Sequence, residues 1–260
     1  MMNKSVDEFV ALNFAAVSLI LDWIFRFRYA FREILIQLNR GEVEWVVNVL
    51  FDFGFIEEVI TVAGRRKKNE DKPRAVIFLT DLGDKTIRSI YDYRYLYLRE
   101  PTGTPEKLFR HSFYIQLQTL QALNSGYIVA FNTEKDLAKI SLPGVKKHDA
   151  IWITKYNHRI AVEVELTSKE SELTAEVTDP KTLNYFVSTC VVALETVVVG
   201  QAIDGIFIFS DDEDLLKIYQ AAFKPKAAYS LTQKVRSVYK EISQYQIPQS
   251  LAGRVMCVKI

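Results

Sequence analysis

Apolar residues recur at helical spacing from Val6 to Phe27, and neither proline nor glycine interrupts them. This pattern predicts one long helix, and a second helix is expected over Tyr29 to Leu38. The turn Asn39-Arg40-Gly41 leads into a third helical pattern over Glu42 to Phe53, which Gly54 ends. The first fifty residues are therefore predicted to be a helical cluster.

A strand hairpin is expected next, because the β-branched segment Phe55 to Val62 and the apolar segment Ala75 to Leu79 flank a polar run. That run is basic and contains Arg65, Arg66, Lys67, Lys68 and Lys72. Three helices followed by such a hairpin resemble a winged helix, and Leu79 to Gly83 is similar to the segment that often follows the wing. The resemblance implies a winged helix-turn-helix DNA-binding domain over residues 1–100, with the five basic residues contacting phosphates.

Pro101, Gly103 and Pro105 punctuate the chain, so we place a domain boundary between residues 100 and 101. Beyond it the patterns predict, in order, a helix, three strands, a helix, a strand and a helix: Glu106–Leu123, Tyr127–Phe131, His148–Thr154, Arg159–Thr167, Pro180–Val198, Asp204–Phe209 and Asp212–Phe223. This order predicts a mixed sheet flanked by helices over residues 101–260. The whole chain is assigned to the α/β (α+β) class.

Acidic residues concentrate in the expected hairpin between His148 and Thr167. Side chains alternate faces along a strand, so Glu163 and Glu165 share one face of the sheet. If the turn centres near Tyr156 or Asn157, Asp149 lies across from one of these acids, with Cβ atoms about 5 Å apart. Three close carboxylates repel unless a cation joins them, and oxygen ligands suit Mg²⁺ or Mn²⁺.

Such a metal can activate a water and stabilise charge on a phosphodiester, with Lys169 near the water or the phosphate. The alternative is that the acids form the solvated face of an amphipathic sheet. Likewise, Arg65 to Lys68 could be a solvated loop.

The arrangement of Asp149, a hairpin and Glu163-Val164-Glu165 resembles the PD-(D/E)xK restriction-endonuclease-like superfamily. Glu165 stands where that pattern has lysine; some active restriction enzymes carry Glu-x-Glu, and non-cutting members also exist. The resemblance implies that Asp149, Glu163 and Glu165 bind the metal and that Lys169 is a catalytic residue.

Taken with the N-terminal winged helix, Asp149 and the segment Val162 to Lys169 are similar to the MobC class of plasmid mobilisation relaxases and the related replication-relaxation family. This resemblance spans almost the whole chain. It implies nicking of one strand of double-stranded DNA at a plasmid transfer origin, with partners in a relaxosome or coupling complex. It also implies catalytic contributions from an upstream helix, at His111 or Glu106.

Two other functions stay open. The chain could be a non-catalytic DNA-binding accessory protein or replication regulator with a silent nuclease-like domain, which the Glu-for-Lys change favours. It could also be a defence or transposition nuclease. A palindromic target would favour a homodimer.

The amino-acid composition limits the kinds of binding site and the cellular location that we expect. The 33 basic and 32 acidic residues nearly cancel, so any nucleic-acid footprint is local. Cys190 and Cys257 have apolar neighbours, which indicates reduced core thiols and a cytoplasmic protein. No zinc-ligand spacing, Walker loop, dinucleotide fingerprint, signal peptide or membrane-spanning segment is evident in the sequence.

In the third helix, Glu42, Glu44 and Asn48 are expected on the exposed side, and the two acids argue against tight phosphate contact and so against reading of the major groove. Trp23 and Trp45 fall within apolar helical patterns and are expected in the core.

Overall fold

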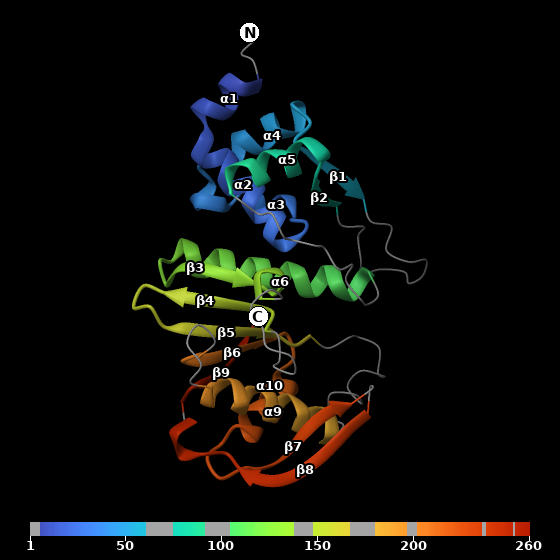
Figure 1. Ribbon diagram of the computed structural model, residues 1–260, viewed down its shortest axis with the longest axis vertical. Coiled ribbons are helices and arrows are strands. Elements are labelled where there is room, and N and C mark those ends of the chain that lie inside the picture. The colour runs from blue at the N-terminus through green and yellow to red at the C-terminus, as the bar shows by residue number, and fades with distance from the viewer. Residues whose placement is uncertain are drawn as a thin grey trace. The chain divides into compact units, whose positions relative to one another are not determined.

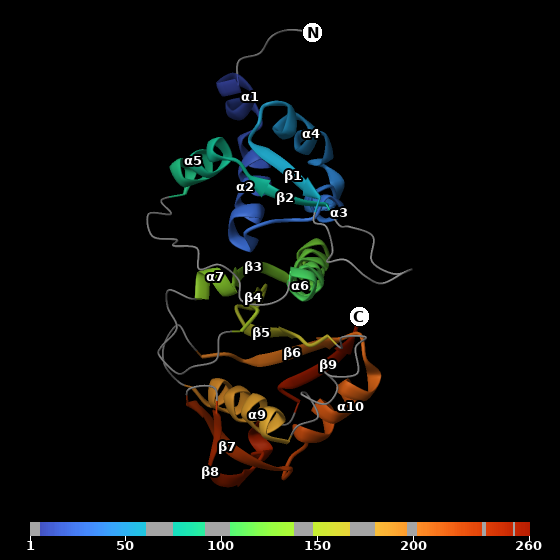
Figure 2. The same cartoon turned by 90° about the vertical axis from the view of Figure 1, so that its right-hand side faces the viewer.

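A computed structural model describes residues 6–60, 75–91, 105–137, 148–166, 180–196, 202–235, 238–251 and 253–260. The chain forms two compact units, Met1–Gly126 and Tyr127–Ile260. The first combines helices with a two-stranded hairpin, and the second combines helices with a five-stranded mixed sheet and a further hairpin (Figures 1 and 2). The predicted α/β (α+β) class is confirmed.

Two helices replace the single long helix expected at the start. Helices α1 (Val6–Leu12) and α2 (Phe14–Phe27) meet at Asn13 with a bend of 96°. The side-chain amide of Asn13 donates to the Phe9 carbonyl at 2.9 Å. Because asparagine bonds locally to backbone groups, it favours helix ends over helix interiors. The prediction of an unbroken helix was wrong at this residue.

The second expected helix is shorter than its apolar pattern indicated. Helix α3 covers only Arg32–Leu35, and a 3₁₀ segment, η1, follows over Leu38–Gly41. Asn39 and Arg40 adopt φ of 47° and 58°, and the chain then enters α4 (Glu44–Asp52). The predicted turn at residues 39–41 is confirmed.

A hairpin follows α4, as expected. Strands β1 (Ile56–Ile60) and β2 (Ala75–Leu79) pair antiparallel, with Ile56 opposite Leu79. The backbone of Ala30 also pairs with Ile77, which ties the hairpin to the helices. Helix α5 (Asp81–Ile90) begins directly after β2, with the hydroxyl of Thr80 accepting from the Gly83 N–H as its N-cap.

Helix α6 (Pro105–Asn124) belongs to the N-terminal unit, whereas the sequence pattern assigned it to the C-terminal domain. The buried side chain of Gln116 accepts from the Trp23 indole at 3.0 Å and donates to the Tyr29 carbonyl at 3.0 Å. Two further bonds join α6 to the η1 region: Arg40 donates to the Asn124 carbonyl, and the side-chain amide of Asn124 donates to the Gln37 carbonyl. The units therefore divide after Gly126 and not near residue 100.

The C-terminal sheet has the strand order β3-β4-β5-β6-β9. Strands β3 (Ile128–Thr133), β4 (Ala150–Thr154) and β5 (Arg159–Val164) form an antiparallel meander, with the short helix α7 (Glu134–Leu137) after β3. Helix α9 (Pro180–Glu195) connects β5 to the parallel strand β6 (Gly205–Ser210), and α10 (Glu213–Ala222) follows. As far as α10, the predicted order of helices and strands is confirmed in the described residues, apart from the additional α7.

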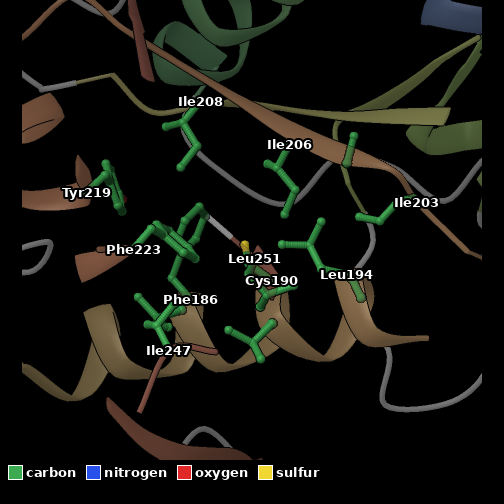
Figure 3. Close-up of a cluster of buried hydrophobic side chains, with 14 of the residues drawn as sticks. Phe186, Cys190, Leu194, Ile203, Ile206, Ile208, Tyr219, Phe223, Ile247 and Leu251 are labelled. Carbon is green, nitrogen blue, oxygen red and sulfur yellow. The ribbon is translucent and has the colours of Figure 1, made fainter. Parts of the chain in front are cut away.

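Helices α9 and α10 pack on one face of the sheet, where they enclose the core of this unit (Figure 3). Phe186 and Cys190 of α9 and Tyr219 of α10 meet Ile206 and Ile208 of β6. The ring centroids of Phe186 and Tyr219 are 4.8 Å apart. One face of β5 is turned toward this core, because Ala161 belongs to the same cluster.

The sequence patterns did not predict the elements after α10. Strands β7 (Ala228–Val235) and β8 (Val238–Gln246) form a separate antiparallel hairpin, and a 3₁₀ turn, η2, covers Gln249–Leu251. Strand β9 (Val255–Lys259) then returns to the main sheet and pairs parallel with β6. In the described ranges, no single helix is long and apolar enough to cross a membrane; α1 and α2 would pass only as a bent pair.

Candidate functional site

The three acids predicted to act together lie at one end of the β4–β5 hairpin. The pairing of Ala150 with Val162 puts Asp149 just before β4, beside the end of β5 that carries Glu163. Glu165 follows directly and donates its backbone N–H to Phe209 of β6 at 2.8 Å. The expected register is confirmed, with the turn centred on residues 155–157 and Asn157 at φ 62°.

Asp149 helps to hold the two strands together. Its backbone N–H donates to the Val162 carbonyl at 3.2 Å, and its Oδ2 accepts the Val164 N–H at 2.8 Å. The side chain thus supplies an acceptor for the backbone of β5 beyond the last paired residues of the two strands. One oxygen of the Asp149 carboxylate is therefore already hydrogen-bonded.

Glu163 is buried, with 3% of its surface exposed, although it lies on a strand whose acids could have formed a solvated face. Strand β5 is central, with β4 on one side and β6 on the other, and its two faces are both covered at Glu163 and Val164. The solvated-face interpretation is therefore wrong for Glu163. A buried carboxylate needs compensating partners.

The partner that the structure provides is His148. Its Nδ1 lies 2.5 Å from Oε1 of Glu163, and only 4% of His148 is exposed. The sequence gives His148 no predicted role, because no histidine lies at zinc-ligand spacing from either cysteine. Its position next to Asp149, across from two acids, was the available signal.

Glu165 interacts with Tyr219, which reaches the site from α10. The Tyr219 pKa is raised well above its usual range, first by burial and then by the charges of nearby acids, among which Glu165 contributes most. A hydrogen bond to Glu165 acts in the same direction. The tyrosine therefore stays protonated and can donate to the carboxylate. Sequence reasoning missed Tyr219 because 54 residues separate it from Glu165.

As placed, these side chains do not fit a metal centre. Among the described residues, no group of three or more His, Cys, Asp or Glu side chains is arranged to hold an ion. Asp149 accepts the Val164 N–H, Glu163 contacts His148, and Glu165 interacts with Tyr219. The three carboxylates are near one end of the hairpin, but the expected Mg²⁺ or Mn²⁺ site is not preformed.

The other predicted catalytic residues belong to the N-terminal unit or lie outside the described residues. His111 is half-buried on α6 and belongs to the N-terminal unit, as does Glu106, whose side chain lies outside the described residues. Lys169 also lies outside the described residues. So do the predicted DNA-binding residues of the basic run: Arg65, Arg66, Lys67, Lys68 and Lys72.

Helix α4 exposes the acidic face that the sequence indicated. Glu42, Glu44 and Asn48 are exposed, and the guanidinium of Arg32 donates to Asn48 at 3.3 Å. Trp23 is buried as predicted, but 53% of Trp45 is exposed, so the prediction of a core position was wrong for it. The Trp45 ring makes an edge-to-face contact with Phe9, with 6.1 Å between the ring centroids.

Comparisons with protein-family models, curated proteins and solved structures returned no match.

Proposed function

We propose that the chain is a DNA-binding protein that nicks one strand at a plasmid transfer origin, with the C-terminal unit as an endonuclease-like domain. The observation that carries the proposal is the placement of Asp149, Glu163 and Glu165 at one end of the hairpin formed by β4 and β5. These acids also lie within the helix and strand order of a mixed sheet flanked by helices. That combination supports a restriction-endonuclease-like domain.

The N-terminal unit supports the DNA-binding part of the proposal. Its helices are followed by an antiparallel hairpin, β1–β2, and the chain between the two strands contains the basic run from Arg65 to Lys72. This is the element order of a winged helix, in which cationic hairpin residues would contact phosphates. The acidic face of α4 disfavours insertion of that helix into a groove. A cytoplasmic location and relaxosome partners belong to the same proposal.

A second candidate function is a DNA-binding accessory protein or replication regulator that does not cut. The contact between His148 and Glu163 favours it, because a buried carboxylate that already has a partner can be purely structural. Glu165 in place of the lysine of the family pattern points the same way. In this case Mg²⁺ or Mn²⁺ would have no role.

One experiment separates the two candidates. Supercoiled plasmid carrying a transfer origin is incubated with the full chain and Mg²⁺, Mn²⁺ or EDTA, and the wild type is compared with Glu163→Gln. Glu241→Gln, an exposed position on β8, is the matched control. Metal-dependent nicking that Glu163→Gln abolishes and Glu241→Gln preserves supports the enzyme, whereas origin binding without nicking supports the accessory protein.

DNA binding is tested in parallel by electrophoretic mobility shift. Replacing Arg65, Arg66, Lys67 and Lys68 by alanine should weaken DNA binding and reduce its salt dependence. The reason is that a protein that contacts fewer phosphates releases fewer counterions from the DNA. Lys85→Ala, at an exposed position on α5, is the control. A variant without the basic run that binds as well as the wild type would remove the hairpin from the proposal.

A further inference from the structure

An exposed apolar patch joins helices α1 and α4 of the N-terminal unit, which lie side by side (Figures 1 and 2). Trp45 of α4 is 53% exposed, and its ring contacts that of Phe9 on α1 edge-to-face. Leu12, which is 62% exposed, and the exposed Val6 lie one turn from Phe9 on the same side of α1. We call these four residues the α1–α4 patch. Exposed apolar side chains that gather in this way, unlike scattered ones, mark an interaction surface.

Acidic residues accompany the patch on both helices. Helices α1 and α4 contain four acids, Asp7, Glu8, Glu44 and Asp52, and no lysine or arginine. All four acids are exposed, and Glu42, which precedes α4, adds a fifth exposed carboxylate. The patch therefore lies in a region of negative charge, although the whole chain carries a formal net charge of +1.

Two arginines lie near α4 or the turn before it, and both have other partners. The guanidinium of Arg32 lies over the Phe51 ring, 4.7 Å from its centroid, and forms an ion pair with Glu58 of β1 at 3.2 Å. Arg40 donates to the Asn124 carbonyl on α6. Within the described part of the chain, neither arginine forms an ion pair with an acid of α4. The acids beside the patch thus keep their charge for a binding partner.

We propose that the α1–α4 patch binds a cationic amphipathic helix of a partner protein. Such a helix presents apolar side chains at i, i+3 and i+4, with lysine or arginine beside them. Its apolar side chains would cover Trp45 and Leu12, and its cations would approach Glu44 and Asp52. Because tryptophan is among the residues that contribute most to binding at protein interfaces, Trp45 is the expected anchor. The inference goes beyond the proposed function and requires neither nicking nor DNA binding.

The negative charge selects this partner over three other occupants. The five exposed acids would repel DNA phosphates and anionic lipid headgroups. A second copy related by a two-fold axis would bring the same acids to face one another, and like charges across an interface are unfavourable. A cationic amphipathic helix is complementary to both the charge and the apolar surface.

The test uses the full chain and a fluorescein-labelled synthetic peptide of leucine and lysine, whose sequence forms an amphipathic helix. Fluorescence anisotropy measures the dissociation constant. The control peptide has the same composition in a scrambled order that gives no apolar side. The wild type should bind the amphipathic peptide at least about tenfold more tightly than the control, equivalent to about 1.4 kcal/mol. Equal binding of the two peptides would overturn the proposal, because charge alone would then account for it.

Trp45→Ala should weaken binding of the amphipathic peptide at least about tenfold. Trp45→Phe keeps an aromatic ring against Phe9 and should retain most of the affinity. The matched control is Tyr156→Ala, which removes an exposed aromatic ring from the C-terminal unit and should bind like the wild type. Wild-type affinity in Trp45→Ala, or an equal loss in Tyr156→Ala, would refute the proposal.

The role of charge is tested with Glu44→Gln. This variant should weaken binding by up to about fivefold and reduce its dependence on salt, because one attraction between exposed charges is lost. Glu241→Gln removes the same charge from an exposed position on β8 and should change neither property. Equal effects of the two substitutions would mean that the peptide binds any acidic surface, against the proposal.

Acrylamide quenching of the wild type gives a measurement that does not depend on the folding of a variant. Saturating unlabelled peptide should reduce the quenching of tryptophan fluorescence, because Trp45 is exposed whereas Trp23 and Trp152 are buried. Unchanged quenching at saturation would place the peptide elsewhere and overturn the proposal.

The other occupants would give different results. Self-association in sedimentation velocity that Trp45→Ala abolishes would identify a second copy. A blue-shifted emission with phosphatidylcholine vesicles, without peptide binding, would identify a membrane surface, and a mobility shift of DNA lost in Trp45→Ala would assign the patch to DNA. Each of these results would overturn the proposal. Because nicking and DNA binding of the wild type are measured separately, failure of the proposed function is distinguishable from failure of this inference.

Discussion

The indole N–H of Trp23 donates to Oε1 of Gln116 across 93 residues of sequence, at 3.0 Å. The same glutamine donates to the Tyr29 carbonyl and is completely buried. One side chain on α6 therefore bonds both to a side chain of α2 and to the backbone just after that helix. These two hydrogen bonds explain why helix α6, which the sequence pattern assigned to the C-terminal domain, belongs to the N-terminal unit.

Replacing Gln116 by alanine should lower the free energy of unfolding by about 1–3 kcal/mol, because the Trp23 N–H and the Tyr29 carbonyl both lose a buried partner. Urea denaturation followed by far-ultraviolet circular dichroism measures the change. Gln118→Ala, at a half-buried position on the same helix, should cost clearly less. Equal costs for the two variants would show that the Trp23 bond is not stabilising.

Trp45 should be the tryptophan that soluble quenchers reach. It is 53% exposed, whereas Trp23 and Trp152 are 1% and 2% exposed. Acrylamide should therefore quench part of the wild-type emission readily, and Trp45→Phe should remove that fraction. Trp23→Phe is the comparison, and it should leave the quenchable component in place. Quenching unchanged by Trp45→Phe would contradict the exposed position.

Gly83→Ala should destabilise the protein, although alanine favours helices by about 1 kcal/mol over glycine. A Cβ at this position would lie 2.1 Å from the Phe55 carbonyl oxygen. That oxygen cannot move freely, because it accepts the Thr80 N–H at 3.0 Å. We expect a net loss of about 1–3 kcal/mol from overpacking. Lys85→Ala, exposed on the same helix, should change the unfolding midpoint in urea little.

Stability should fall at alkaline pH partly through Cys257. Burial raises the pKa of this thiol from 9.0 to about 11. Between these values the unfolded chain loses the proton while the folded chain keeps it, so the unfolded state gains stability as pH rises. The contribution is fully present below pH 9 and is lost as pH approaches 11.

The measurement is the free energy of unfolding against pH under reducing conditions, for the wild type and Cys257→Ser. The serine variant should show a shallower decline between pH 9 and pH 11, because its hydroxyl does not titrate there. The buried tyrosines whose pKa values are raised, including Tyr219, affect both proteins alike. Parallel curves would mean that Cys257 does not contribute.

Local pattern was sufficient for much of the secondary structure. The alternation of apolar and polar residues, together with apolar runs, predicted the β4–β5 hairpin, the neighbouring strands β3 and β6, and helices α9 and α10. The same pattern predicted that Asp149 lies across from Glu163 or Glu165, because register in a hairpin follows from its turn, and the pairing of Ala150 with Val162 puts it beside Glu163. It failed at Asn13, where the chain bends and a local side-chain bond is made within a segment whose apolar residues recur at helical spacing on both sides.

Long-range contacts decided the rest. The assignment of α6 depended on Gln116 and Trp23, and the return of β9 to the sheet depended on pairing with β6 after a separate hairpin. At the site, the sequence by itself determined which acids lie at one end of the hairpin. Only the tertiary structure decided that His148 and Tyr219 would reach them, because a buried carboxylate takes its partner from whatever the packing of β4 and α10 brings within bonding distance.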